Sequence, residues 1–152
     1  MKNKELFDRT IGILVNAYLN DTLVYASCRV CAVGNIVAAS HGIKIIRKGN
    51  LIDFEPSQQF SDPFKNSGAW GLSVKMSKGK LIKVDPRSEL NVSKTGYSLA
   101  ELALVEKAFC EGTQQYDGSN FKGLMSVVDT LMEIHEATTE EAEAAKLLFV
   151  KP

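Results

Sequence analysis

The sequence feature that most constrains this fold is the helical periodicity of residues 6–19, which is apolar on two faces. One face follows the three-and-four spacing of a helix and comprises Leu6, Thr10, Ile13, Leu14, Ala17 and Tyr18. A second face comprises Phe7, Ile11, Val15 and Leu19. Because a helix with two apolar faces must be covered on more than one side, we expect it at the centre of the core.

The next segment is composed almost entirely of small and apolar residues. Ser27 is a good N-cap, because its hydroxyl can accept a hydrogen bond from a free backbone N–H of the first turn. Gly42 suits the left-handed position that follows a helix. These signals predict a buried helix from Cys28 to about Ser40, packed against the first helix as an antiparallel helical hairpin.

The middle of the chain has the composition of β-structure. Residues 43–47 and 51–54 flank a turn at 48–50, and residues 72–76 and 80–84 flank a turn at 77–79. Each pair predicts a β-hairpin. Between the hairpins, aromatic residues that need a packing surface favour an ordered loop over a linker. They are Phe60, Phe64 and Trp70.

The last third returns to helical patterns. Ser98 and Glu101 form a capping-box signature, and Glu111-Gly112 is expected to end that helix. Ser119 is expected to cap a longer helix that reaches about Glu136. The segment 138–141 is expected to cap a short final helix.

We therefore predict an α+β fold that is mainly α and forms one domain over residues 1–152. A helical hairpin at residues 1–40 is followed by a β-hairpin region at 41–97. Helices within 98–152 complete one core.

Composition narrows the protein class. The chain is 45% hydrophobic with a formal net charge of zero, as expected for a soluble globular protein rather than a disordered one. No apolar run approaches the roughly 20 residues that span a bilayer, and residues 1–9 lack the apolar region of a signal peptide. Three cysteines fit a reducing compartment, so we expect a cytoplasmic location without membrane contact.

Charge is unevenly distributed along the chain. Residues 41–97 carry ten basic and five acidic side chains, whereas residues 98–152 carry four basic and ten acidic ones. Such asymmetry can mark a basic surface for an acidic partner such as a nucleic acid. We favour a second interpretation, in which oppositely charged regions face each other within the chain or between subunits. The basic residues of the predicted hairpins are Lys44, Arg47, Lys48, Lys75, Lys78, Lys80 and Lys83.

The Cys28-x-x-Cys31 element is the one local motif that points towards chemistry. At a helix N-terminus, free N–H groups and the helix dipole favour thiolate, which is the physics of a redox site. Zinc binding is a second alternative, with His41 and Cys110 as further ligands. A continuous helix would hold His41 roughly 15–20 Å from Cys28, which argues against that set. We favour a third interpretation, in which both cysteines are small packing residues.

Two other chemical features of the last long helix have plain structural explanations. Asp129, Glu133 and Glu136 share one helix face by their spacing, and we interpret them as a solvated acidic face. His135 has no partner motif of the di-metal type, so we interpret it as a surface or packing residue.

Two strings carry a family resemblance, namely residues 28–38 (CRVCAVGNIVA) and residues 123–136 (GLMSVVDTLMEIHE). They resemble small proteins of bacteria and their prophages that have no assigned activity. The resemblance covers both helical ends and implies an accessory, phage-associated role rather than metabolic catalysis.

The sequence contains no complete catalytic set, and its neutral charge does not oppose self-association. We therefore expect a non-enzymatic structural or protein-interaction domain that acts without a cofactor and whose partner is a protein, including copies of itself. A thiol site at Cys28 and Cys31, redox-active or zinc-binding, is the first alternative. Nucleic-acid binding by the basic hairpins is the second.

Overall fold

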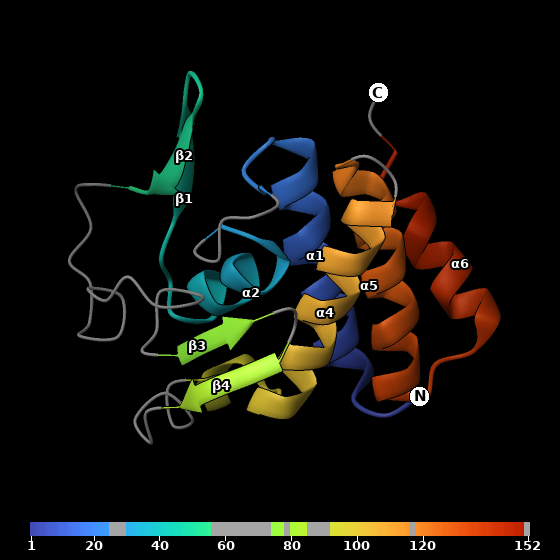
Figure 1. Cartoon of the computed structure of the whole chain (residues 1–152). Helices are drawn as coiled ribbons and strands as arrows, with labels where there is room; N and C mark the ends of the chain where they lie inside the picture. The colour runs from blue at the N-terminus through green and yellow to red at the C-terminus, as the bar shows by residue number, and fades with distance from the viewer. Residues whose placement is uncertain (25–29, 56–73, 78–79, 85–91, 116–117, 151–152) are drawn as a thin grey trace.

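The computed structural model describes residues 1–24, 30–55, 74–77, 80–84, 92–115 and 118–150. It confirms an α+β fold that is mainly α (Figure 1). Its long helices are α1 (Lys4–Leu19), α4 (Leu99–Gln115) and α5 (Asn120–His135), and its short ones are α2 (Ala32–Ser40), α6 (Thr139–Leu147) and the 3₁₀ turn η3 (Ser93–Thr95). Two antiparallel hairpins pair β1 (Ile45–Lys48) with β2 (Leu51–Phe54) and β3 (Val74–Ser77) with β4 (Lys80–Val84).

The first helix is central to the core, as its two apolar faces predict. Helix α1 contacts both α2 and α5, and its fully buried positions come from both faces. They are Leu6, Phe7, Thr10, Ile11, Leu14 and Ala17. Asn3 caps the helix through its side-chain oxygen, which accepts from the Leu6 N–H at 3.2 Å.

The second helix starts later than its sequence predicts. It begins at Ala32, and its N-cap is Cys31, whose sulfur accepts from the Gly34 N–H at 3.3 Å. Val30 lies in a turn, so the prediction of a helix through that position is wrong. Cys31 has an extended backbone, so the helix begins after it and does not include it. The predicted cap, Ser27, lies outside the described residues.

The first hairpin follows the predicted pattern closely. Gly49 and Asn50 form its two-residue turn, and Gly49 has the positive φ of 60° that suits glycine at the first turn position. The ladder pairs Lys48 with Leu51 and Ile45 with Phe54. The second hairpin is also present in the backbone, whereas Phe60, Phe64 and Trp70 lie outside the described residues.

The C-terminal helices pack as predicted, with one correction. Helix α4 continues past Gly112 to Gln115, so Glu111-Gly112 does not end it. Gly112 leaves room for α5 instead of ending α4. A Cβ at this position would lie 2.5 Å from Ser126 Oγ and 3.1 Å from the Cα of Gly123. The two glycines permit a close approach between α4 and α5, the helix pair with the most extensive contact in the described structure.

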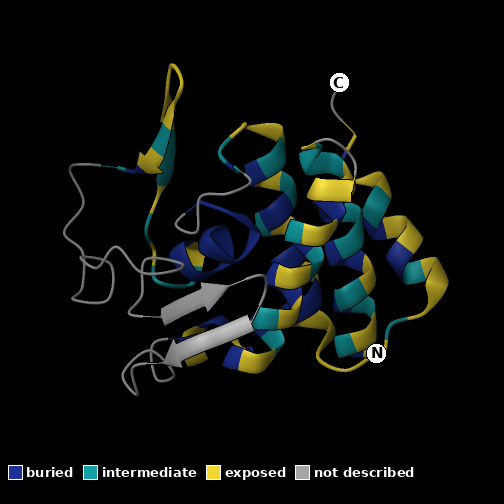
Figure 2. Ribbon diagram, in the orientation of Figure 1, coloured by how far each residue is buried: buried dark blue, intermediate teal, exposed yellow. Residues whose placement is uncertain are grey.

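The predicted caps of these helices are confirmed. The Ser98 hydroxyl accepts from the Glu101 N–H at 3.1 Å, and the Glu101 carboxylate accepts from the Ser98 N–H at 2.8 Å. Thr138 and Glu141 form the same pair of bonds at 3.1 and 2.9 Å. Ser119 Oγ accepts from the Lys122 N–H. One hydrophobic cluster draws on α1, α2, α4, α5 and α6, and α2 is buried along most of its length (Figure 2).

Candidate functional site

Two cysteine thiols converge on one buried carboxylate between α2 and α4. The Cys31 thiol donates to Glu106 Oε2 at 3.0 Å, and the Cys110 thiol donates to Glu106 Oε1 at 3.5 Å. Cys31 and Glu106 are 2% and 5% exposed, whereas Cys110 is half-buried. The thiols therefore help to solvate a carboxylate that would otherwise be costly to bury.

The zinc set considered from the sequence is only partly assembled. Cys31 and Cys110 come together, but His41 is the C-cap of α2 and lies at the opposite end of that helix from Cys31. Cys28 lies outside the described residues. Within the described part of the chain, no three His, Cys, Asp or Glu side chains are arranged to hold a metal ion.

A second polar cluster is buried between the start of the chain, α1 and the end of α5. His135 Nδ1 donates to the backbone carbonyl of Lys2 at 2.7 Å, and the Lys2 N–H donates to the carbonyl of His135 at 2.6 Å. The other ring nitrogen, Nε2, lies 2.7 Å from the Tyr97 hydroxyl. That hydroxyl lies 2.8 Å from Thr10 Oγ1, which also donates to the Leu6 carbonyl.

This cluster joins distant parts of the sequence and excludes solvent. His135, Tyr97 and Thr10 are 3%, 3% and 1% exposed. Burial raises the pKa of the Tyr97 hydroxyl to about 12, and the hydrogen bond with Thr10 opposes that rise only in part. Each polar atom named here has a partner, so the cluster acts as a structural clasp rather than as an open reactive site.

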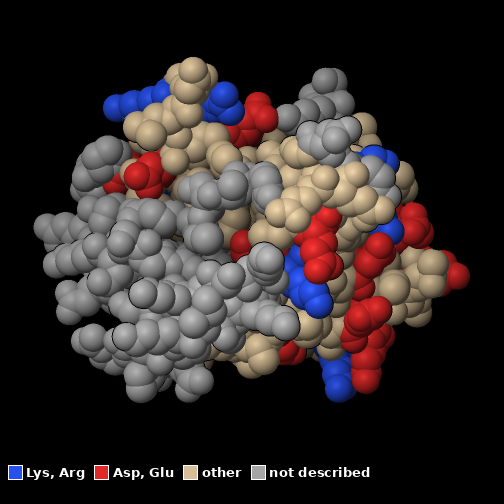
Figure 3. Space-filling view, viewed as in Figure 1, with Lys and Arg blue, Asp and Glu red and all other residues tan. Residues whose placement is uncertain are grey.

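The basic residues predicted on the hairpins are only partly described. Lys44, Arg47 and Lys48 are exposed on the β1–β2 hairpin, where basic side chains gather near its tip (Figure 3). In the second hairpin, the backbone register pairs Lys75 with Lys83, and Lys80 with Ser77. Lys78 lies outside the described residues.

Arg47 holds the first hairpin in place rather than standing free. Its Nε donates to the Gly49 carbonyl at 2.9 Å, and its Nη1 donates to the Asp21 carbonyl at 3.3 Å. The first bond braces the turn, and the second ties the hairpin to the chain that follows α1. The turn is therefore positioned before any partner binds.

The acidic face predicted on α5 is divided between different contacts. Asp129 forms a 2.7 Å ion pair with Lys146 of α6, and Glu136 pairs with Lys2 at 3.4 Å. Glu133 instead lines a groove between α4 and α5. The carboxylates do not converge on one point, which agrees with their interpretation as a solvated face.

The groove between α4 and α5 is lined by apolar and charged side chains; we call it the α4–α5 groove. Its volume is about 480 Å³. Leu104 contributes the most exposed apolar side chain, at 53%, beside Ala108 and Ile134. Its charged lining residues are Glu101, Lys107, Glu111 and Glu133.

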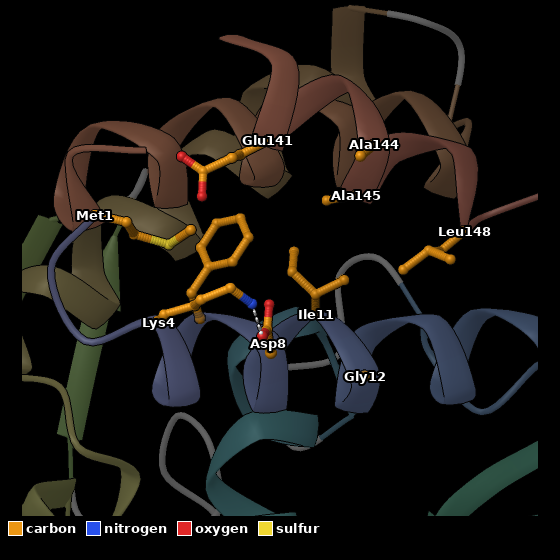
Figure 4. A pocket seen from close by; sticks show the side chains of 10 residues that line it. Met1, Lys4, Asp8, Ile11, Gly12, Glu141, Ala144, Ala145 and Leu148 are labelled. Atoms are coloured by element: carbon orange, nitrogen blue, oxygen red, sulfur yellow. Dashed lines mark hydrogen bonds and ion pairs between the residues drawn. The ribbon is translucent and has the colours of Figure 1, made fainter. Parts of the chain in front are cut away.

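A second groove of about 440 Å³ runs between α1 and α6 (Figure 4). Ile11 and Ala145 face into it, and Met1 and Leu148 stand at its two ends. Across its mouth, the Lys4–Asp8 ion pair lies opposite Glu141. Lys4 and Asp8 neutralise each other, so the carboxylate of Glu141 is left as the unbalanced side-chain charge of the lining.

Sequence reasoning missed the buried polar residues that hold the helices together. Glu106 lies within the helix predicted after Ser98 without a local signal for its burial, and Asn35, 6% exposed, has no signal beyond its position inside an apolar segment. His135 was expected to pack or lie at the surface, and its hydrogen bonds depend on contacts with residues far away in sequence. Apolar neighbours around a lone polar residue were the available signal.

Comparisons with known proteins add no relationship, since no family model, curated protein or solved structure matches the chain. Among the described residues, no helix has the length and apolar character needed to cross a membrane.

Proposed function

We propose that this protein is a non-enzymatic interaction domain that assembles with further copies of itself. One observation carries the proposal: exposed leucines stand beside charges of opposite sign on two separate surfaces. Leu51, 66% exposed, is the cross-strand partner of Lys48, and Leu104 lies among three glutamates on the α4–α5 groove. Exposed apolar side chains with a charged rim are typical of protein interfaces.

The positions of the reactive side chains also support this proposal. His135, Tyr97 and Thr10 hydrogen-bond within the core, and Glu106 accepts from two thiols there. These groups stabilise packing between helices instead of opening onto a cavity. We extend the proposal to a phage-associated accessory role and to a reducing, cytoplasmic location, which suits cysteines such as Cys31 and Cys110 that are kept as thiols.

Sedimentation equilibrium over a dilution series tests self-association. The apparent mass should rise above 16.7 kDa, the mass of one chain, as the concentration increases. A constant mass of one chain across the whole series, in low salt, would contradict the proposal. The same series run with an excess of duplex DNA tests the basic hairpins as a nucleic-acid surface, because complex formation that falls steeply with salt would favour that function instead.

A thiol site is a second candidate, favoured by the contact of Cys31 and Cys110 with Glu106. The contact places both thiols within hydrogen-bond distance of one buried acceptor. Reaction of the native protein with a thiol reagent, followed by zinc assay after unfolding, tests this candidate. A functional site requires either one thiol that reacts much faster than in the unfolded chain or one zinc ion per chain. Cys28→Ser and Cys31→Ser should each remove that signal.

The outcome against the thiol site is equally definite. If the native thiols react only as the protein unfolds and no zinc is released, the cysteines are packing residues. Cys110→Ser is a useful comparison, because it removes the half-buried thiol while leaving the Cys-x-x-Cys intact.

A further inference from the structure

The tip of the β1–β2 hairpin is a small apolar knob with a basic flank. The register places the side chains of Lys48 and Leu51 on the same face of the hairpin, because directly opposite residues share a face. Both residues are exposed. Within residues 47–51, Arg47 and Lys48 are the only charged residues, so the tip carries a net charge of +2.

The α4–α5 groove has the complementary properties. Three glutamates and one lysine give its lining a net charge of −2, and Leu104, Ala108 and Ile134 contribute apolar surface to the same lining. A leucine entering this groove would exchange water for apolar contact. A lysine beside that leucine would lie within the field of the glutamates.

The hairpin tip does not reach the α4–α5 groove of its own molecule. In Figure 1 the hairpin projects away from the helices, and Arg47 ties it to the end of α1 rather than to α4 or α5. Tip and groove are therefore both available on the same molecule for different neighbours.

From this complementarity we propose that the hairpin tip of one copy docks in the α4–α5 groove of a second copy. This inference rests on the proposed self-association and names its surfaces. Because the contact joins two different surfaces, it is head-to-tail: each bound copy still presents one free tip or groove. Such contacts produce open chains or closed rings rather than symmetric dimers.

The test uses two variants, each of which replaces an apolar and a charged side chain of one of the two surfaces. The tip variant carries Lys48→Ser and Leu51→Ser, and the groove variant carries Leu104→Ser and Glu133→Gln. All four positions are exposed, so both variants should fold, and circular dichroism checks this. Leu147→Ser is the matched control, because Leu147 is 73% exposed and lies outside both surfaces.

Each variant alone should sediment as a monomer where the wild type and the Leu147→Ser control associate. An equimolar mixture should form a discrete 1:1 heterodimer, because one variant keeps its groove and the other keeps its tip. In that mixture, ¹³C-labelled methyl groups of Ala108 and Ile134 in the tip variant should shift as the unlabelled groove variant is added.

Two results would overturn the inference while leaving the proposed function standing. In the first, either variant still associates as the wild type does; in the second, the mixture remains monomeric although the wild type associates. A wild type that is monomeric throughout would overturn both proposals. Loss of DNA binding in the tip variant, with self-association unchanged, would assign the tip to a nucleic acid instead.

Discussion

At the residue scale, a single buried amide connects the chain before α2 to the helix start. Asn35 Nδ2 lies 3.1 Å from the Thr22 carbonyl, 3.1 Å from the Val30 carbonyl and 3.0 Å from the Cys31 carbonyl. The Val30 and Cys31 carbonyls also accept from the backbone N–H groups of Val24 and Asn35, so the side-chain amide gives each of them a second donor. The amide therefore stabilises the backbone around the Cys31 cap.

Asn35→Ala should lower the free energy of unfolding by about 2 kcal/mol, because it removes the buried amide that hydrogen-bonds the Thr22, Val30 and Cys31 carbonyls. Chemical denaturation with a fixed slope measures this change. Asn20→Ala is the matched control: its exposed amide bonds only within its own helix turn, to Asn16, so its effect should stay within about 0.5 kcal/mol. Equal changes in the free energy of unfolding for the two substitutions would show that the Asn35 hydrogen bonds stabilise the fold no more than exposed ones.

Tyr97 makes the free energy of unfolding depend on pH in the alkaline range. Its pKa is about 12 in the folded protein against an ordinary value of 10.0, so between these values the folded state holds a proton that the unfolded state has lost. The stabilisation is complete below pH 10.0 and is lost as the pH rises through about 12. The expected loss is about 2–3 kcal/mol.

Denaturation of wild type and Tyr97→Phe across this range isolates the effect, since all other alkaline titrations are common to both chains. The wild type should lose stability more steeply than the variant. Parallel pH profiles would mean that the Tyr97 hydroxyl titrates equally in the folded and unfolded states.

At the element scale, glycines in helices have opposite effects according to their surroundings. Gly112 and Gly123 lie where α4 and α5 approach closely, whereas a Cβ at Gly12 of α1 would meet no atom within 4 Å. The same residue type thus permits contact between helices in one place and only weakens a helix in another.

Gly12→Ala should raise the free energy of unfolding by about 0.5–1 kcal/mol through lower backbone entropy. Gly112→Ala should lower it by about 1–3 kcal/mol, because the added methyl group meets Ser126 and the Gly123 backbone. Thermal and chemical denaturation of the two variants give the comparison. Stabilisation by Gly112→Ala would show that the α4–α5 contact relaxes at little cost.

At the scale of the whole molecule, opposite charges occupy different regions. Basic side chains mark the tip of the first hairpin, and acidic ones gather over the C-terminal helices (Figure 3). Under the proposed self-association, this arrangement would let the basic region of one copy attract the acidic region of another without a large apolar patch.

The proposed self-association should therefore weaken as salt is added, because salt screens the attraction between exposed basic and acidic side chains of two copies. Sedimentation equilibrium at low and high sodium chloride measures the association constant. Association that strengthens with salt would indicate an apolar contact, such as one through the α1–α6 groove, in place of the charged surfaces.

Local signals in the sequence were sufficient for most elements of the fold, but not for the start of α2 or the end of α4. Periodicity placed the long helices, the capping residues Ser98, Ser119 and Thr138 placed three helix starts, and the turn at Gly49 placed the first hairpin. These signals work because capping and turn formation depend on bonds between residues a few positions apart.

The tertiary structure decided what the sequence left open. The Cys31–Glu106 contact joins residues 75 positions apart, and the Thr10–Tyr97 contact joins residues 87 apart. Periodicity carries no information about such pairs. Gly112 looked like a helix end for the same reason: only the approach of α5 shows why glycine is needed there. The chain itself thus determined which segments are helical or extended, and packing between distant segments determined which polar groups are buried and which leucines remain exposed.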